Sequence, residues 1–110
     1  MSDSINWARE LPAAFTVCDR HGIILEMNDQ AKSTFSGDLV GKSVLDCHPE
    51  PARGKLAELL ATGKSNVYTI EKKGRKKLIY QTPWYQDGEF AGLVEVSLEL
   101  PDSLPHFRRD

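Results

Sequence analysis

The stretch DRHGIILEMNDQA, Asp19 to Ala31, decides the fold of this chain. It opens with a polar turn in which Gly22 can supply the positive φ that closes a short hairpin. Apolar runs at 14–18 and 23–27 flank this turn. Asn28 then opens a segment of helical composition, and an asparagine side chain can cap the first free N–H groups of a helix. The stretch therefore predicts two antiparallel strands followed directly by a helix.

Size and composition are typical of one soluble globular domain. The chain has 110 residues, 40% of them hydrophobic and 27% charged, which leaves room for a single core. No run approaches the roughly 18 apolar residues that would span a bilayer. The N-terminus, MSDSINW, lacks the basic and apolar parts of a signal peptide. We therefore expect a cytoplasmic protein without membrane association. Its net charge of −2 also argues against nucleic acid as a partner.

The segments on either side of this stretch predict further helices and a β-rich second half. Ser4 to Leu11 predicts a short helix that Pro12 stops. A longer helix is expected from Pro49 to about Thr62, with Gly63 at its C-terminal cap. Three strands are then expected at 66–72, 75–85 and 89–100.

The last of these strands has a clear period of two. Its apolar positions are Val94, Val96, Leu98 and Leu100, and its polar positions are Glu95, Ser97 and Glu99. Such alternation predicts one buried face and one face in water.

Five positions in the opening stretch fit the pattern Asp-x-x-Gly-x-Ile followed by Asn-x-x-Ala. They are Asp19, Gly22, Ile24, Asn28 and Ala31. This pattern resembles the opening of a PAS domain, a small sensor and interaction module of bacterial signalling. The segments LDCHP and GEFAGLVEV look like those of a bacterial sensory-box subgroup with Cys-His-Pro before the long helix.

The resemblance implies an α+β fold. It consists of a five-stranded antiparallel sheet in the order 2-1-5-4-3, with helices on one face. The chain would divide into an N-terminal helix at 1–11, a PAS core at 12–100 and a polar C-terminal tail at 101–110.

Cys47 and His48 form the segment that most suggests chemistry. Both residue types bind metals, and some PAS domains carry haem on a histidine near this helix. However, the spacing of Cys18, His21, Cys47 and His48 lacks the C-x₂-C pattern of zinc sites. A structural role for His48 at the start of the helix is the main interpretation, with ligand contact as the alternative. We expect no metal, haem or flavin, and no disulfide between Cys18 and Cys47.

Aromatic side chains on the third and fourth strands offer a second set of candidates. Tyr80 and Trp84 could contact a small organic ligand, although packing is the more ordinary role of aromatics on strands. With Cys47 and His48, they complete the predicted ligand pocket. No catalytic set stands out, so we expect no enzyme. The alternatives are a small enzyme using His48 and Asp46, or a haem-binding redox sensor, on the same α+β shell.

Five basic residues surround Gly74 at the predicted hairpin tip. They are Lys72, Lys73, Arg75, Lys76 and Lys77. A solvated turn that protects strand edges explains them best. Docking to an acidic partner and contact with phosphates are the alternatives.

The function expected from these features is that of a stand-alone sensory or interaction module in signal transduction. Its signal would pass to another chain, either a signalling protein or a second copy. The N-terminal helix presents apolar residues that a small core does not fully cover, which favours a homodimer. These candidates for the interface are Ile5, Trp7, Ala8 and Leu11.

Overall fold

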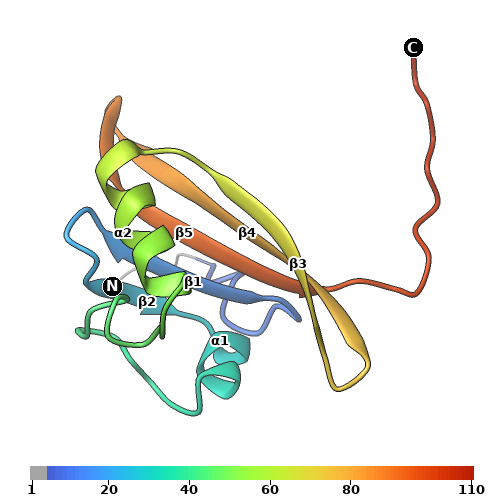
Figure 1. Ribbon diagram of the computed structural model, residues 1–110, viewed down its shortest axis with the longest axis horizontal. Helices are drawn as coiled ribbons and strands as arrows, with labels where there is room; N and C mark the ends of the chain where they lie inside the picture. Colours follow the sequence, from blue (N-terminus) through green and yellow to red (C-terminus); the bar gives the residue numbers. More distant parts are fainter. Residues whose placement is uncertain (1–4) are drawn as a thin grey trace.

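The computed structural model describes residues 5–110 and contains one sheet and two helices (Figure 1). The elements in chain order are β1 (Ala14–Asp19), β2 (Ile24–Met27), α1 (Asp29–Thr34), α2 (Ala52–Thr62), β3 (Asn66–Lys72), β4 (Arg75–Gln86) and β5 (Glu89–Glu99). A connection of turns joins α1 to α2 at 35–51. No helix in the described part of the chain is long and apolar enough to cross a bilayer.

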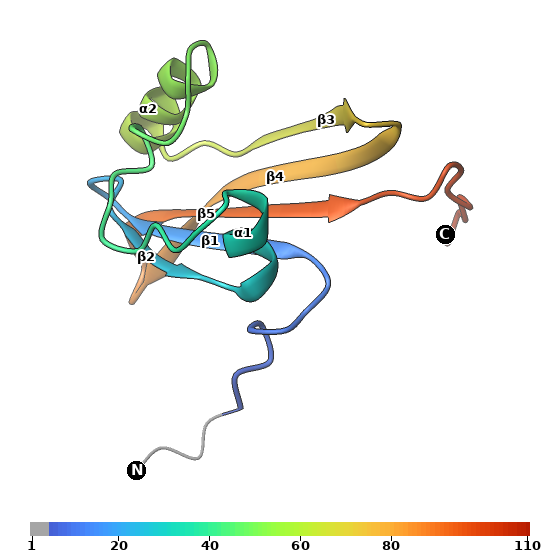
Figure 2. The ribbon, with the colours of Figure 1, turned by 90° about the horizontal axis from the view of Figure 1, so that it is seen from below.

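The five strands form an antiparallel sheet in the order β2-β1-β5-β4-β3. Both helices lie on the same side of this sheet (Figure 2). We call this side the inner face and the opposite side the outer face. The α+β fold, the strand order and the helices on one face confirm the architecture that the resemblance to PAS domains implied.

The opening stretch folds as its residues require. Gly22 has φ +85° in the β1–β2 turn, and the Asp19 carboxylate accepts hydrogen bonds from the N–H groups of His21 and Ile23. Asn28 caps α1, because its Oδ1 accepts from the N–H of Ala31 at 3.1 Å. Gly63 ends α2 in the left-handed conformation, as its position predicted.

The predicted N-terminal helix is wrong for the residues that the structure describes. Residues 7–10 form a turn, and the predicted start at Ser4 lies outside the described residues. Two features of the chain explain why no helix forms there. Pro12 has no N–H to donate to the carbonyl of Ala8, which the Asn28 side chain binds instead. The carbonyl of Arg9 is likewise taken by the N–H of Asp29.

The core lies between the inner face and the helical layer. Leu56 and Leu59 of α2 are buried in one cluster with Cys18 of β1 and Leu93 of β5. The buried residues of β1 are Ala14, Thr16 and Cys18, so alternate positions of this strand face the core.

The alternation of β5 is confirmed, but its apolar side faces away from the helices. Leu93 and Ser97 pair with Cys18 and Ala14 of β1, so they share the inner face. Val94 and Val96 therefore lie on the outer face, where they are half-buried. The period of two predicts that the two sides of the strand differ, but it does not tell which side the helices cover.

Candidate functional site

The inner face is closed by packing where α2 covers it. Leu56 and Val44 approach Thr16 and Leu93 there, and the cavity that they line holds about 10 Å³. That is about the space of one water molecule. An organic ligand does not fit this part of the interior in the described conformation.

A row of polar side chains crosses the inner face beside this packed part. Asn66 of β3 donates to Oε1 of Gln81 on β4 at 2.9 Å. Gln81 in turn donates through Nε2 to Oε1 of Glu95 on β5, also at 2.9 Å. Gln81 is only 3% exposed, so both of its hydrogen bonds replace contacts with water. The row fixes the relative positions of three strands and places a carboxylate group on the inner face.

The pKa of Tyr68 is affected by the charge of Glu95 in this row. Tyr68 lies on β3, two residues after Asn66, and therefore on the same face. Burial raises the pKa of the Tyr68 hydroxyl above its usual value, and the negative charge of Glu95 raises it further.

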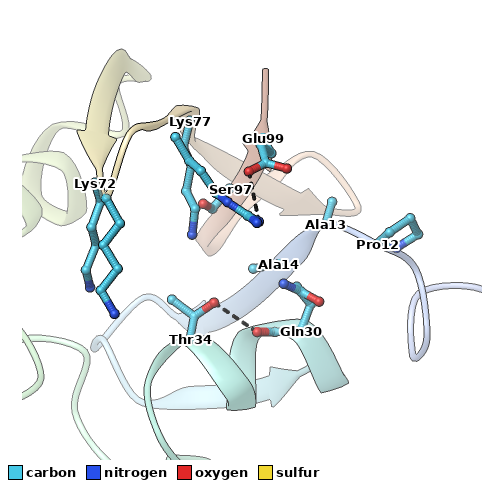
Figure 3. A pocket seen from close by; sticks show the side chains of 11 residues that line it. Pro12, Ala13, Ala14, Gln30, Thr34, Lys72, Lys77, Ser97 and Glu99 are labelled. Carbon is cyan, nitrogen blue, oxygen red and sulfur yellow. Dashed lines mark hydrogen bonds and ion pairs between the residues drawn. The ribbon is translucent and has the colours of Figure 1, made fainter. Parts of the chain in front are cut away.

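Where α2 does not cover it, the inner face opens into a groove between α1 and the β3–β4 hairpin (Figure 3). Its volume is about 700 Å³, within the range of small-molecule sites. One wall is basic and consists of Lys72, Lys73, Arg75 and Lys77. The opposite wall is neutral and polar, from Gln30 and Thr34 of α1, and the floor includes Pro12, Ala13, Ala14 and Ser97. We call this feature the basic groove.

Glu99 is the single acidic residue that lines the basic groove, and it pairs with Arg75 at 3.3 Å between Nη1 and Oε1. Four cationic side chains and one carboxylate give the lining a net charge of +3. This local charge is opposite in sign to the net charge of −2 of the whole chain. The arrangement favours an anion, since positive charge gathered in a concave site attracts one.

Cys47 and His48 lie in the α1–α2 connection, away from the basic groove. The Cys47 thiol donates to the carbonyl of Ser43, and burial, with help from Asp46, raises its pKa. Nδ1 of His48 donates to the carbonyl of Val44 at 2.8 Å, and its ring meets Phe35 edge-on at 5.8 Å. Within residues 5–110, no group of three or more His, Cys, Asp or Glu side chains is placed to hold a metal ion.

Trp84 and Tyr80 occupy two other places on the sheet. The Trp84 indole reaches across β5 to donate from Nε1 to the carbonyl of Cys18 at 3.0 Å. Tyr80 pairs with Val96 on the outer face and is 42% exposed. The four predicted pocket residues are therefore not brought together in one cavity. The basic groove was missed because the sequence shows its lysines only as a hairpin tip.

Neither helix covers the outer face (Figure 2), and the strands place a set of apolar side chains on it. Its members by strand register are Val67, Leu78, Tyr80, Phe15, Val17, Val94, Val96 and Leu98. The N-terminal turn borders this surface, with the Trp7 ring packed edge-on against Phe15 at 5.7 Å between centroids.

Of the predicted interface residues, two stay largely exposed next to the outer face. Ile5 and Trp7 are 85% and 66% exposed, whereas Ala8 and Leu11 are partly buried against the chain itself.

Comparison with solved structures identifies the architecture. The chain matches the PAS domain of BvgS from Bordetella pertussis with a TM-score of 0.67 and 20% identity, over 86% of this chain and 82% of that one. A sensory box sensor histidine kinase from Vibrio cholerae matches with a TM-score of 0.67 and 16% identity, over 86% of both chains. The VqmA dimer of Vibrio cholerae, a LuxR-type receptor, matches with a TM-score of 0.60 and 18% identity, over 86% of this chain and 48% of that one.

Sequence comparison gives a different neighbour. No family model matches the chain. Ribosome maturation factor RimM of Acetivibrio thermocellus is 30% identical over 77 residues, which are 70% of this chain and 42% of that protein. The chain thus spans less than half of that relative, and the match does not extend to its whole architecture. The structural matches to BvgS and to the sensory box kinase each cover 86% of this chain, so they define the fold.

Proposed function

We propose that this chain, which has the PAS fold, is a cytoplasmic sensory and interaction module in signal transduction rather than an enzyme. In this proposal the inner face receives a small organic ligand, and the outer face binds a second copy of the chain. The similarity to the PAS domain of BvgS and to a sensory box sensor histidine kinase supports the sensory role.

One observation carries the proposal, namely the uncovered apolar outer face with Trp7 at its border. Half-buried side chains such as Val96 and Leu98 keep apolar surface in water in a monomer. A contiguous apolar patch of this kind commonly marks an interface, and a two-fold homodimer is the commonest arrangement. VqmA of Vibrio cholerae, about half of which matches this chain, is a dimer, and this supports the same arrangement.

Strand β5 supplies a route between the two faces. Glu95 and Ser97 lie on the inner face, whereas Val94 and Val96 lie on the outer face of the same strand. A ligand that moves β5 on the inner side must therefore also move side chains in the dimer interface. No transfer of electrons or covalent chemistry is needed for such a signal.

The enzyme alternative has less support. His48 and Asp46 were its candidates, but Nδ1 of His48 is bound to a backbone carbonyl. Asp46 is exposed and lies 4.0 Å from Arg53. A His48→Ala variant assayed against a metabolite panel separates the two classes, because only an enzyme would lose turnover.

Sedimentation of the intact chain tests the dimer. We expect a dimer at micromolar concentration and a monomer for Tyr80→Lys, because a charge would then lie within the apolar interface. Val40→Lys is the matched control, since Val40 is similarly exposed at 46% but lies in the α1–α2 connection. Val96→Lys provides a second outer-face variant, and thermal unfolding of each variant confirms that it is folded. A wild-type chain that remains monomeric at high micromolar concentration would refute the proposed interface.

A further inference from the structure

We propose that the basic groove binds a small organic polyanion, a molecule carrying two or more carboxylate or phosphate groups. Its role as a signal rests on the sensory function proposed above, whereas the binding itself does not.

The walls of the groove match such a molecule in charge and polarity. The anionic groups would lie against Lys72, Arg75 and Lys77, where ammonium and guanidinium donors make charge-assisted hydrogen bonds. Gln30 and Thr34 on the opposite wall can bind hydroxyl or carbonyl groups. The floor contains Ala13 and Ala14, which suit a short hydrocarbon backbone.

The hairpin tip holds its cations at a conformational cost. Lys73 has φ +53° and Gly74 has φ +76°, the geometry of a type I′ turn. Asparagine is the usual first residue of that turn, because a lysine side chain is disfavoured at positive φ. A lysine there gives up turn stability and adds a fourth cation to the groove wall. The loss of turn stability is explained if the positive charge of Lys73 contributes to binding an anion.

The shape of the groove favours a small molecule over a nucleic acid. It is a half-open hollow bordered by α1, β1, β5 and the hairpin (Figure 3). No aromatic residue is among those that line it, so unpaired bases would find no stacking surface in it. Lys76, the fifth basic residue of the tip, stands opposite Glu71 on the other face and does not line the groove.

The test is a titration of the isotope-labelled intact chain with citrate and with pyrophosphate at constant ionic strength. Binding is measured by NMR from the chemical shifts of the backbone amides. We expect saturable shifts at Gln30, Thr34 and Ser97. The double variant Lys72→Gln/Lys77→Gln should weaken binding by about tenfold or more, because two charge-assisted contacts are lost.

The matched control is Lys64→Gln/Lys76→Gln, which removes the same total charge outside the groove and should change the affinity by less than about twofold. A further variant separates binding from folding. Lys73→Asn should raise the thermal stability, since it suits the turn, and should weaken binding by about threefold.

Equal weakening by the two double variants would overturn the inference, because it would indicate unspecific charge attraction. So would shifts confined to Thr16, Leu56 and Gln81, which would place the ligand in the packed interior, or the absence of any saturable binding. Tighter groove-dependent binding of a short single-stranded RNA than of both small anions would also overturn it, in favour of a nucleic-acid site.

Anion binding by a chain that sediments as a monomer would support this inference and contradict the proposed interface. A dimer that binds no anion would do the reverse.

Discussion

The side chain of Asn28 makes four hydrogen bonds that join three separate segments. Its Oδ1 accepts from the N–H groups of Phe15 and Ala31, and its Nδ2 donates to the carbonyls of Ala8 and Ala13. We expect Asn28→Ala to lower the free energy of unfolding by about 2–4 kcal/mol, because a helix cap is lost and buried partners are left unpaired.

Denaturant unfolding measures this loss. Asn28→Asp is the informative comparison, since it keeps the acceptor but puts a second carboxylate oxygen against two carbonyls. It should be about as destabilising as alanine near neutral pH. A loss below about 1 kcal/mol in both variants would contradict this account of Asn28.

Gly92 of β5 stands opposite Asp19 of β1. It has φ +153°, and a Cβ at this position would overlap the carbonyl oxygen of Cys18. We expect Gly92→Ala to cost about 3 kcal/mol or more, because the backbone of β1 would have to move. Thermal unfolding should show the loss, and the change in Trp84 fluorescence should show that its bond to Cys18 is disturbed.

Gly88→Ala is the control for this substitution. Gly88 also has positive φ, at +83°, but no atom lies within 4 Å of its virtual Cβ. The cost there should be about 1 kcal/mol, from backbone conformation alone. Equal costs at the two glycines would show that the close approach at Gly92 is unimportant.

The polar row across β3, β4 and β5 gives the sheet a measurable pH dependence. Because the pKa of Tyr68 is raised in the folded state, the unfolded chain ionises first as the pH rises through about 10. The stabilising contribution of neutral Tyr68 is therefore complete below that pH and is lost as the pH rises through the folded-state pKa. Ultraviolet titration, with Tyr68→Phe to assign the transition, should show one tyrosine ionising late.

Glu95→Gln should lower this tyrosine pKa but leave it above the ordinary value, since burial is the larger cause. An unchanged titration in Glu95→Gln would show that the two side chains do not interact.

At the level of elements, the sequence correctly predicted those turns and helix ends that depend on residues close together in the chain. The β1–β2 turn, the α1 cap and the end of α2 each depend on one residue with a special conformation or side chain, namely Gly22, Asn28 and Gly63. The N-terminal helix was predicted wrongly because the hydrogen bonds that compete with it come from Asn28 and Asp29, about 20 residues further along.

At the level of the whole molecule, the basic groove could not be predicted from the sequence. Its walls come from α1 and from the β3–β4 hairpin, which are separated by the whole of α2. They line the same groove only because the folded sheet places the hairpin opposite α1 (Figure 3). The four predicted pocket residues failed to gather for the same reason, since residue type alone does not place a side chain on the inner or outer face.

The packed interior also leads to a prediction about cofactors. A cavity of about 10 Å³ beneath α2 has no space for a haem or a flavin. The lining of the basic groove has no His, Cys, Met or Tyr to bind haem iron, and no aromatic side chain to stack on a flavin. We expect the purified protein to be colourless. An absorption band of haem or flavin in stoichiometric amount would contradict this, and mass spectrometry of molecules released on denaturation would identify any other ligand.

The close approach at Gly92 has a consequence for how the chain avoids misfolding. If β5 slipped by one residue, Val94, Val96 and Leu98 would face the core in place of Leu93, Glu95 and Ser97, so hydrophobic burial alone favours the wrong pairing. In the native pairing Gly92 stands opposite Asp19, where no side chain fits, and a slip in either direction brings Ala91 or Leu93 to that point. The absence of a side chain at Gly92 therefore sets the register of the sheet, because only the native pairing avoids a clash, although it buries fewer apolar side chains than the slipped pairing.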